Sequence, residues 1–156
     1  MSFYKKICNK SPLIMGILNI TPDSFYDGNQ YIDFQAIKKR IIDMQEQGVD
    51  IIDIGAISSR PGASDISESE EAERLIDIYI KIKHTFPNVI TSIDTYRSNI
   101  ARETIKYGAN IINDIYAGSY DSNIIHLVKE KRIPYVVMHM KGTPQNMQSR
   151  IKYENF

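Results

Sequence analysis

Short apolar runs alternate with amphipathic segments along the whole chain. The runs lack the strict in-and-out alternation of a strand with one wet face, and this is typical of strands buried on both faces of a parallel sheet. Turn or loop residues bound each run. The pattern predicts five strands, at about residues 13–19, 49–55, 89–94, 109–113 and 133–138. In the first strand we expect Leu13, Ile14, Ile17 and Leu18 to be buried.

The intervening segments carry apolar residues three and four positions apart, which predicts four amphipathic helices. Asp33 can cap the first helix, and Gly48 ends it. Ser67 and Glu70 form a capping-box pattern at the start of the second. The third spans about residues 98–107 and stops at Gly108. The fourth spans about residues 122–131, with Asp121 as its predicted cap and a predicted buried face of Ile124, Ile125, Leu127 and Val128.

Two segments, residues 48–54 and 108–115, repeat one local pattern. Each has a glycine at a helix end, two spacer residues, two isoleucines and then a polar side chain. The repetition supports a parallel βα architecture, for which both a barrel and an open doubly wound sheet remain possible. No Gly-x-Gly-x-x-Gly follows a predicted strand and no Walker-type loop occurs, so the usual dinucleotide and phosphate-loop sites lack support.

Polar residues gather where the predicted strands end. In parallel α/β folds ligands bind at the carboxyl ends of the strands. Asp94 and Asn113 together offer a carboxylate and an amide that can contact the edge of a nitrogen heterocycle. Taken singly, such residues more often cap a loop or helix. As a set they predict a site, formed by Asn19, Asp53, Asp94, Asn113 and His139.

Three connecting segments are long and polar, at residues 20–31, 56–67 and 139–150. Binding residues often lie in such loops. The first follows the strand end at Asn19 and contains Phe25, Asp27 and Gly28. This mixture of an aromatic ring, an acid and a glycine suits the cover of a charged substrate, although an ordinary polar turn is the alternative.

Composition narrows the function classes. Nineteen basic residues balance nineteen acidic ones in a chain of 156, so no overall field favours nucleic acid or an anionic membrane as partner. Cys8 is the only cysteine, which excludes an internal disulfide framework and fits a reducing cytoplasm. No apolar stretch approaches the roughly 20 residues of a membrane span. We expect a soluble, cytoplasmic α/β protein.

The motifs at these strand ends closely resemble those of dihydropteroate synthase, a family of pterin-binding (β/α)8 TIM barrels. They occur in the family's order: MGILNITPDSFYDG, DIIDIGAISSRPGA, SIDTYR, INDI and MHMKGTPQNMQ. The resemblance implies condensation of 6-hydroxymethyl-7,8-dihydropterin diphosphate with 4-aminobenzoate, with release of diphosphate, in folate synthesis. It also implies Mg²⁺ as cofactor and a homodimer for full-length members.

The resemblance implies a role for each matching residue. Asn19 matches the metal and diphosphate position, and an amide oxygen is a suitable ligand for Mg²⁺. Asp94, Asn113 and Met138 match pterin-binding positions. The residues matching the two substrate loops are Phe25 and Asp27 in the first, as catalytic residues, and Ser59, Arg60 and Pro61 in the second, for aminobenzoate, with Arg60 also catalytic. Ile57 departs from the family, which often has an acidic residue there. Asp53 and His139 are not expected to be catalytic.

Length is the larger departure, because a (β/α)8 barrel takes about 250 residues. About five βα units fit into residues 1–156, so we expect the amino-terminal part of a single barrel domain, with the carboxy-terminal half absent and little or no activity of this chain alone. Two alternatives stay open: a half-barrel that binds pterin or assembles without catalysis, and a relative of the methyltetrahydrofolate-type methyltransferases. The two substrate loops argue against the second alternative.

Overall fold

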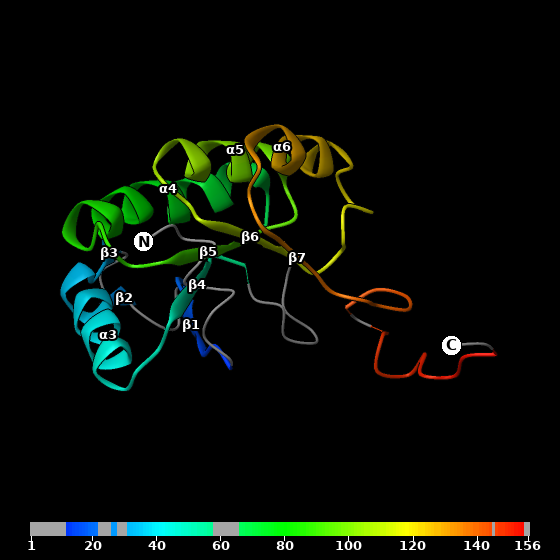
Figure 1. The fold of residues 1–156 in the computed structure, drawn as a ribbon, viewed down its shortest axis with the longest axis horizontal. Coiled ribbons are helices and arrows are strands. Elements are labelled where there is room, and N and C mark those ends of the chain that lie inside the picture. The colour runs from blue at the N-terminus through cyan, green and yellow to red at the C-terminus, as the bar shows by residue number, and fades with distance from the viewer. Residues whose placement is uncertain (1–11, 22–25, 28–30, 58–65, 145, 155–156) are drawn as a thin grey trace.

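A five-stranded parallel sheet forms the centre of the molecule (Figure 1). The computed structural model describes residues 12–21, 26–27, 31–57, 66–144 and 146–154. The strands lie in the order β1 (Met15–Asn19), β4 (Ile51–Gly55), β5 (Thr91–Asp94), β6 (Ile111–Asp114) and β7 (Tyr135–Val137). Each new strand therefore pairs beside the one before it, without the reversal of order that defines a doubly wound sheet. This progression is that of a barrel wall.

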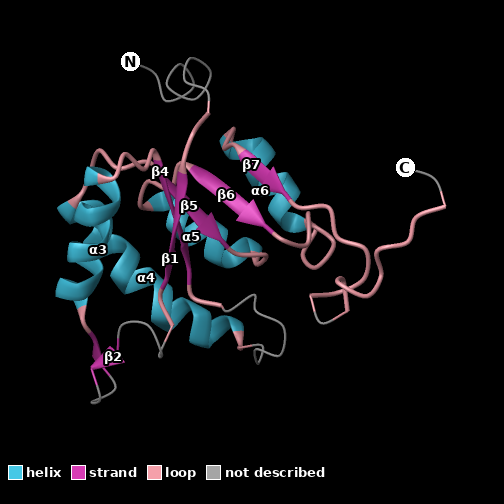
Figure 2. Ribbon diagram, turned by 90° about the horizontal axis from the view of Figure 1, so that it is seen from below, coloured by secondary structure: helices cyan, strands magenta, loops and turns pink. Residues whose placement is uncertain are grey.

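Within the described residues, four helices connect the strands, as the apolar spacing predicts (Figure 2). They are α3 (Phe34–Glu46), α4 (Glu68–Thr85), α5 (Ser98–Lys106) and α6 (Asn123–Lys131). The Asp33 side chain accepts a hydrogen bond from the backbone N–H of Gln35, and Ser67 Oγ accepts one from Glu70. These caps satisfy N–H groups that have no partner within the helix. Both predicted helix starts are confirmed.

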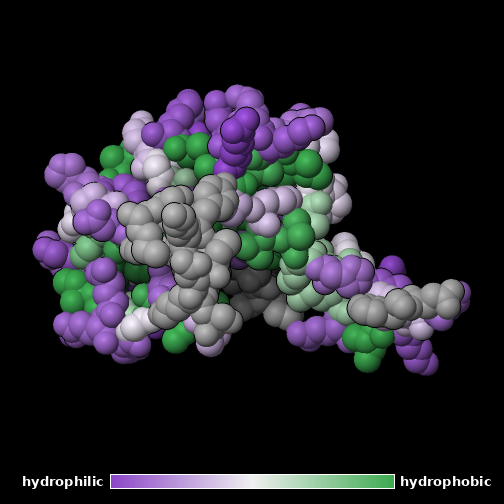
Figure 3. Space-filling view, in the orientation of Figure 1, coloured by the Kyte–Doolittle hydropathy of each residue, from purple (hydrophilic) through white to green (hydrophobic). Residues whose placement is uncertain are grey.

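One hydrophobic core lies between the sheet and these helices. The strands contribute alternate residues to it, including Leu18, Ile54, Ile93 and Ile112, which are 0–1% exposed. The helices contribute their predicted apolar stripes, among them Ile37, Ile41, Leu75, Ile82, Ile124 and Leu127. The opposite helix surfaces are hydrophilic (Figure 3). Because the helices cover one face, the side chains of the other face are left to form the site.

Three predictions of burial are wrong. Ile14 and Ile17 are 52% and 64% exposed. The Ile17 side chain points from the sheet face away from the helices, and no described residue covers it. Ile125 is 46% exposed, since the core-facing stripe of α6 runs through Ile124, Leu127 and Val128 instead. In both elements the apolar pattern predicted the buried face correctly, but it also assigned to that face residues that are exposed.

The first long loop contains structure that the sequence did not indicate. Residues of β2 (Tyr26–Asp27) pair antiparallel with β3 (Tyr31–Ile32) to form a small hairpin.

In the part of the chain that the structure describes, no helix has the length and apolar character needed to cross a membrane. The segment after β7 extends away from the sheet (Figure 1).

Candidate functional site

Three of the predicted site residues lie in one row across the carboxyl ends of the strands. The sheet register pairs Asn19 with Gly55, Gly55 with Asp94, and Asp94 with Asn113. Residues paired in this way point to the same face of a parallel sheet. We call Asn19, Gly55, Asp94 and Asn113 the strand-end row. It places an amide, a carboxylate and a second amide on the face that the helices leave uncovered. The sequence predicted their position at the strand ends, but not this face.

Asp94 has the most perturbed acidity of this row. Burial, followed by the nearby carboxylates of Asp53, Glu71 and Asp114, raises the pKa of its carboxyl to about 7. A group with this pKa can hold or give up a proton near neutral pH. The row therefore offers a carboxyl that can donate or accept a hydrogen bond beside the amide of Asn113.

Gly55 gives Asp94 its space in the row. A Cβ at position 55 would lie 3.1 Å from Asp94 Cβ and 3.2 Å from Asp94 Oδ2. We expect Gly55→Ala to lower the free energy of unfolding by about 1–3 kcal/mol, because the Asp94 side chain must shift within a packed site. Urea denaturation measures this change. An unaltered midpoint would contradict the predicted crowding. A lowered midpoint would be due to crowding and not to backbone strain, because Gly55 has no positive φ.

A second layer lies two residues deeper on the same face. There the register pairs Ile17 with Asp53, Asp53 with Ser92, and Ser92 with Ile111. Asp53 is only 6% exposed, and its Oδ2 accepts a 3.0 Å hydrogen bond from Asn113 Nδ2 in the row above. The sequence predicted Asp53 as a member of the site, and the register places it in this second layer and not in the strand-end row.

Met138 and His139 lie beside the row rather than in it. Both line a hollow of about 440 Å³ beyond the ends of β6 and β7, together with residues that include Tyr116 and Val137. Met138 is half-buried, and its backbone N–H donates to the Asp114 carbonyl. His139 is exposed and its Nε2 lies 3.1 Å from the hydroxyl of Tyr153. The hollow adjoins β7, the strand that pairs with the strand of Asn113, and its lining includes apolar side chains that can contact a flat ring.

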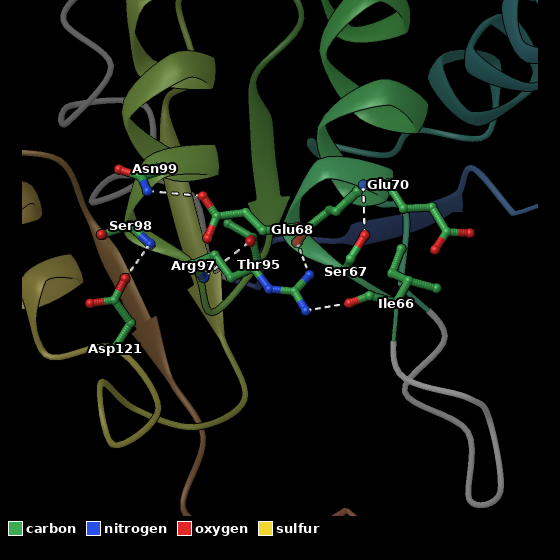
Figure 4. A network of polar contacts seen from close by, with 10 residues as sticks. Ile66, Ser67, Glu68, Glu70, Thr95, Arg97, Ser98, Asn99 and Asp121 are labelled. Carbon is green, nitrogen blue, oxygen red and sulfur yellow. Dashed lines mark hydrogen bonds and ion pairs between the residues drawn. The ribbon is translucent and has the colours of Figure 1, made fainter.

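A buried ion pair braces the loops around this site (Figure 4). Arg97 follows β5, is 4% exposed, and its Nη1 donates to Glu71 Oε2 on α4 at 2.5 Å. Its Nη2 also donates to the backbone carbonyl of Ile66, just ahead of the Ser67 cap. The arginine therefore joins the end of β5 to the start of α4. No local pattern in the sequence predicts this role, because the partners are 26 residues apart.

Asp121 joins the next two units in the same way. Its Oδ2 accepts from the backbone N–H of Ser98, the first residue of α5, and its Oδ1 accepts from Asn123 at the start of α6. The sequence predicted Asp121 as the cap of one helix, and in the structure it binds the amino ends of two. Figure 4 shows the contact with Ser98. The loop after β6 is thereby fixed to the loop after β5.

The other predicted site residues are not described in this detail. Phe25, Ser59, Arg60 and Pro61 lie outside the described residues, and of Asp27 only the backbone, in β2, is described. Among the residues that are described, no three His, Cys, Asp or Glu side chains form a group able to hold a metal ion. Asn19 is exposed at the end of the row, where a single amide oxygen could join ligands supplied by water and substrate.

Comparison with known proteins adds to this geometry. Residues 15–156 match the family model described as pterin binding enzyme. The chain is 43% identical to a folate synthesis bifunctional protein of Arabidopsis thaliana, with 94% of this chain and 31% of the relative covered. It is 35% identical to the Yersinia pestis dihydropteroate synthase solved with a sulfonamide drug, with a TM-score of 0.79 and coverage of 92% and 52% of the two chains.

A third relative is the dihydropteroate synthase of Xanthomonas albilineans solved with 4-aminobenzoic acid. The identity is 35%, the TM-score is 0.75, and 84% of this chain and 47% of that chain are covered. The chain thus spans about a third of the bifunctional relative and about half of each solved synthase. Its sheet with covering helices is the corresponding part of a TIM-barrel wall.

Proposed function

Because this chain belongs to the pterin-binding enzyme family, we propose that residues 1–156 are the amino-terminal part of a dihydropteroate synthase barrel. The proposed reaction joins 6-hydroxymethyl-7,8-dihydropterin diphosphate to 4-aminobenzoate. The observation that carries this proposal is the strand-end row, in which the register pairs Asp94 with Asn113. The half-buried Met138 directly follows β7, the strand that pairs with the strand of Asn113. These are the positions that match the pterin-binding motifs of the family.

In this proposal Asp94 and Asn113 bind the polar edge of the pterin ring. A pterin edge carries both N–H donors and ring acceptors, so it needs a carboxyl and an amide in one plane. Met138 supplies apolar contact to the ring from the neighbouring strand end. Burial of Asp94 strengthens each hydrogen bond that its carboxyl makes, because the surroundings screen it less than water does.

Magnesium is proposed as the cofactor, and Asn19 as the residue of this chain that would hold it. The fit rests on chemistry: Mg²⁺ prefers oxygen ligands and usually shares its coordination sphere with water and phosphate. Bound there, it would neutralise the negative charge that develops on the departing diphosphate. Asn19 lies at the opposite end of the row from Asn113, with Gly55 and Asp94 between them. The row would then separate the diphosphate end of the substrate from its pterin end.

The loop residues complete the proposal. We assign Phe25 and Asp27 to the cover over the pterin methylene carbon, and Ser59, Arg60 and Pro61 to the aminobenzoate side. The planar guanidinium of Arg60 can bind a carboxylate or stack on a ring. The amine of aminobenzoate attacks the methylene carbon as the C–O bond to diphosphate breaks, and the amine then loses a proton.

Two wider assignments accompany the reaction. We propose a homodimer for the complete enzyme and a reducing compartment such as the cytoplasm, which fits the single cysteine, Cys8. The second candidate function is pterin binding without catalysis by this chain, favoured by the location of Asp94, Asn113 and Met138 on only three neighbouring strand ends. A methyltransferase relative is disfavoured, because methyl transfer involves neither diphosphate nor aminobenzoate.

Calorimetry with the pterin diphosphate and Mg²⁺ tests the proposal. We expect the 156-residue chain to bind the compound, and Asn113→Ala to weaken binding about tenfold or more, the effect of losing a buried hydrogen-bonding amide. Asn99→Ala is the matched control, since Asn99 is exposed on α5 and bonds only Glu68 among the described contacts. Absence of binding by the parent chain, or equal losses in the two variants, would overturn the proposed site.

Catalysis is a separate measurement. We expect little or no formation of dihydropteroate by this chain alone. Turnover comparable with that of a complete synthase would show that residues 1–156 contain all the necessary groups.

A further inference from the structure

Asp53 is the buried ionisable group of the site for which the proposed reaction has no use. It lies in the second layer, two residues below the strand-end row, and is 6% exposed. Its register partner is Ser92, which is fully buried. A carboxylate in such a place is costly unless it fulfils a specific interaction.

The contacts of Asp53 identify that interaction. Its Oδ2 accepts the 3.0 Å hydrogen bond from Asn113 Nδ2, across 60 residues of sequence and from a strand that is not its neighbour. Its Oδ1 is buried and has no hydrogen-bond partner among the described residues. Within the described part of the site, the Asn113 amide is therefore the group that compensates this carboxylate.

The bond also determines which way the amide points. An ionised carboxylate can only accept hydrogen bonds, so it attracts the NH2 group of Asn113 and not the amide oxygen. The Asn113 Oδ1 must then face away from Asp53, toward the row and any ligand above it. Without Asp53 the two orientations of the amide would be close in free energy, because nothing described on that side distinguishes oxygen from nitrogen.

We propose that Asp53 is a positioning residue that holds the Asn113 amide with its oxygen presented to the ligand. The identity of the ligand in this inference rests on the proposed function, but the orientation of the Asn113 amide by Asp53 does not. A fixed acceptor at this point of the row selects a heterocycle whose edge carries an N–H donor opposite Asn113, in preference to one that carries an oxygen there. Asp53 itself touches no substrate.

The Asn113 side-chain amide signals in a nitrogen-15 NMR spectrum of the full chain test the structural part. In the parent we expect two resolved Nδ2 proton signals, one of them exchanging slowly with water. Asp53→Asn keeps the shape of the side chain but can also donate, so we expect the slow proton to be lost. Ser92→Ala is the matched control, because it removes a buried polar atom of the same layer without touching Asn113.

Binding of the pterin diphosphate supplies the second readout. We expect Asp53→Asn to weaken it about tenfold, the effect of losing one oriented hydrogen bond, and Ser92→Ala to leave it unchanged. A merely structural role for Asp53 would lower the unfolding midpoint and leave the Asn113 signals of the folded fraction as in the parent. That result would overturn the inference.

Failure of the inference and failure of the proposed function give different results. Unchanged Asn113 signals in Asp53→Asn overturn the positioning role whether or not the ligand binds. Altered signals together with no binding by the parent support the positioning role and overturn the proposed function. If Asp53→Asn does not fold, two rapidly exchanging Asn113 protons in the parent spectrum overturn the inference without any variant.

Discussion

Replacing Asp94 by asparagine is expected to raise the free energy of unfolding near pH 8 by about 2–4 kcal/mol, because one pKa unit corresponds to about 1.4 kcal/mol. Burial, followed by the charges of Asp53, Glu71 and Asp114, raises the pKa of Asp94 from 3.8 to about 7. Near pH 8 the folded chain must keep this carboxylate ionised in a place that disfavours the charge. Asparagine keeps the shape and removes the charge.

The sign of the pH dependence follows from proton binding. Between about pH 4 and pH 7 the carboxyl of Asp94 is protonated in the folded state and ionised in the unfolded state. The unfolded chain binds fewer protons there, so the contribution of Asp94 to stability falls as pH rises through this window. It stays low above about pH 7. In Asp94→Asn we expect this fall to disappear.

Urea denaturation at about pH 4.5 and pH 8 measures the difference, within the range where the chain unfolds in one transition. Asp77→Asn is the matched control, because Asp77 is an exposed carboxylate on α4, and we expect a change of less than about 0.5 kcal/mol at either pH. Equal stability of Asp94→Asn and the parent near pH 8 would show that the site accommodates the charge. Functional sites are often less stable than a variant without the functional group, so a gain in stability on removal of Asp94 would agree with its proposed role in ligand binding.

Replacing Arg97 by methionine is expected to lower the free energy of unfolding by about 3–5 kcal/mol, the effect of leaving one charge of a buried ion pair uncompensated. Its partner, Glu71, is 0% exposed, and burial already raises the pKa of that carboxyl above its ordinary value. Glu71 Oε1 has no hydrogen-bond partner among the described residues, so the arginine supplies the main compensation. The variant also loses the bond from Arg97 to the Ile66 carbonyl.

The double replacement Arg97→Met with Glu71→Met separates charge from packing. We expect it to recover most of the lost stability, because two apolar side chains leave no buried charge. Arg74→Met is the matched control on the same helix: Arg74 pairs with the half-exposed Glu70, and such surface pairs contribute about 0–1 kcal/mol. A double variant as unstable as the single one would place the cost in the Ile66 contact or in packing.

The sequence predicted the features that depend on local pattern. Apolar runs located the five strands, and their polar ends placed Asn19, Asp94 and Asn113 at one edge of the sheet, as the register confirms. Capping residues located α3 and α4 because a cap and its N–H partner are two or three residues apart. These signals lie within one element, so they can be read before the fold is known.

The features that the sequence did not predict depend on pairing between distant segments. The hydrogen bond from Asn113 to Asp53 needs the register of three strands, and the Arg97 pair needs the packing of α4 on the loop after β5. The exposure of Ile17 follows from which sheet face the helices leave open. An isoleucine in a strand has the same local pattern on either face, so only the assembled sheet distinguishes them.

The order of the strands also bears on how the chain folds. Every pairing of the main sheet joins a strand to the one that precedes it in that sheet, from β1 and β4 through to β6 and β7. Contacts between consecutive units have small loop-closure costs and form rapidly. A chain emerging from the ribosome can therefore add each βα unit to a sheet already made, and the strand-end row would assemble from Asn19 toward Asn113 during synthesis.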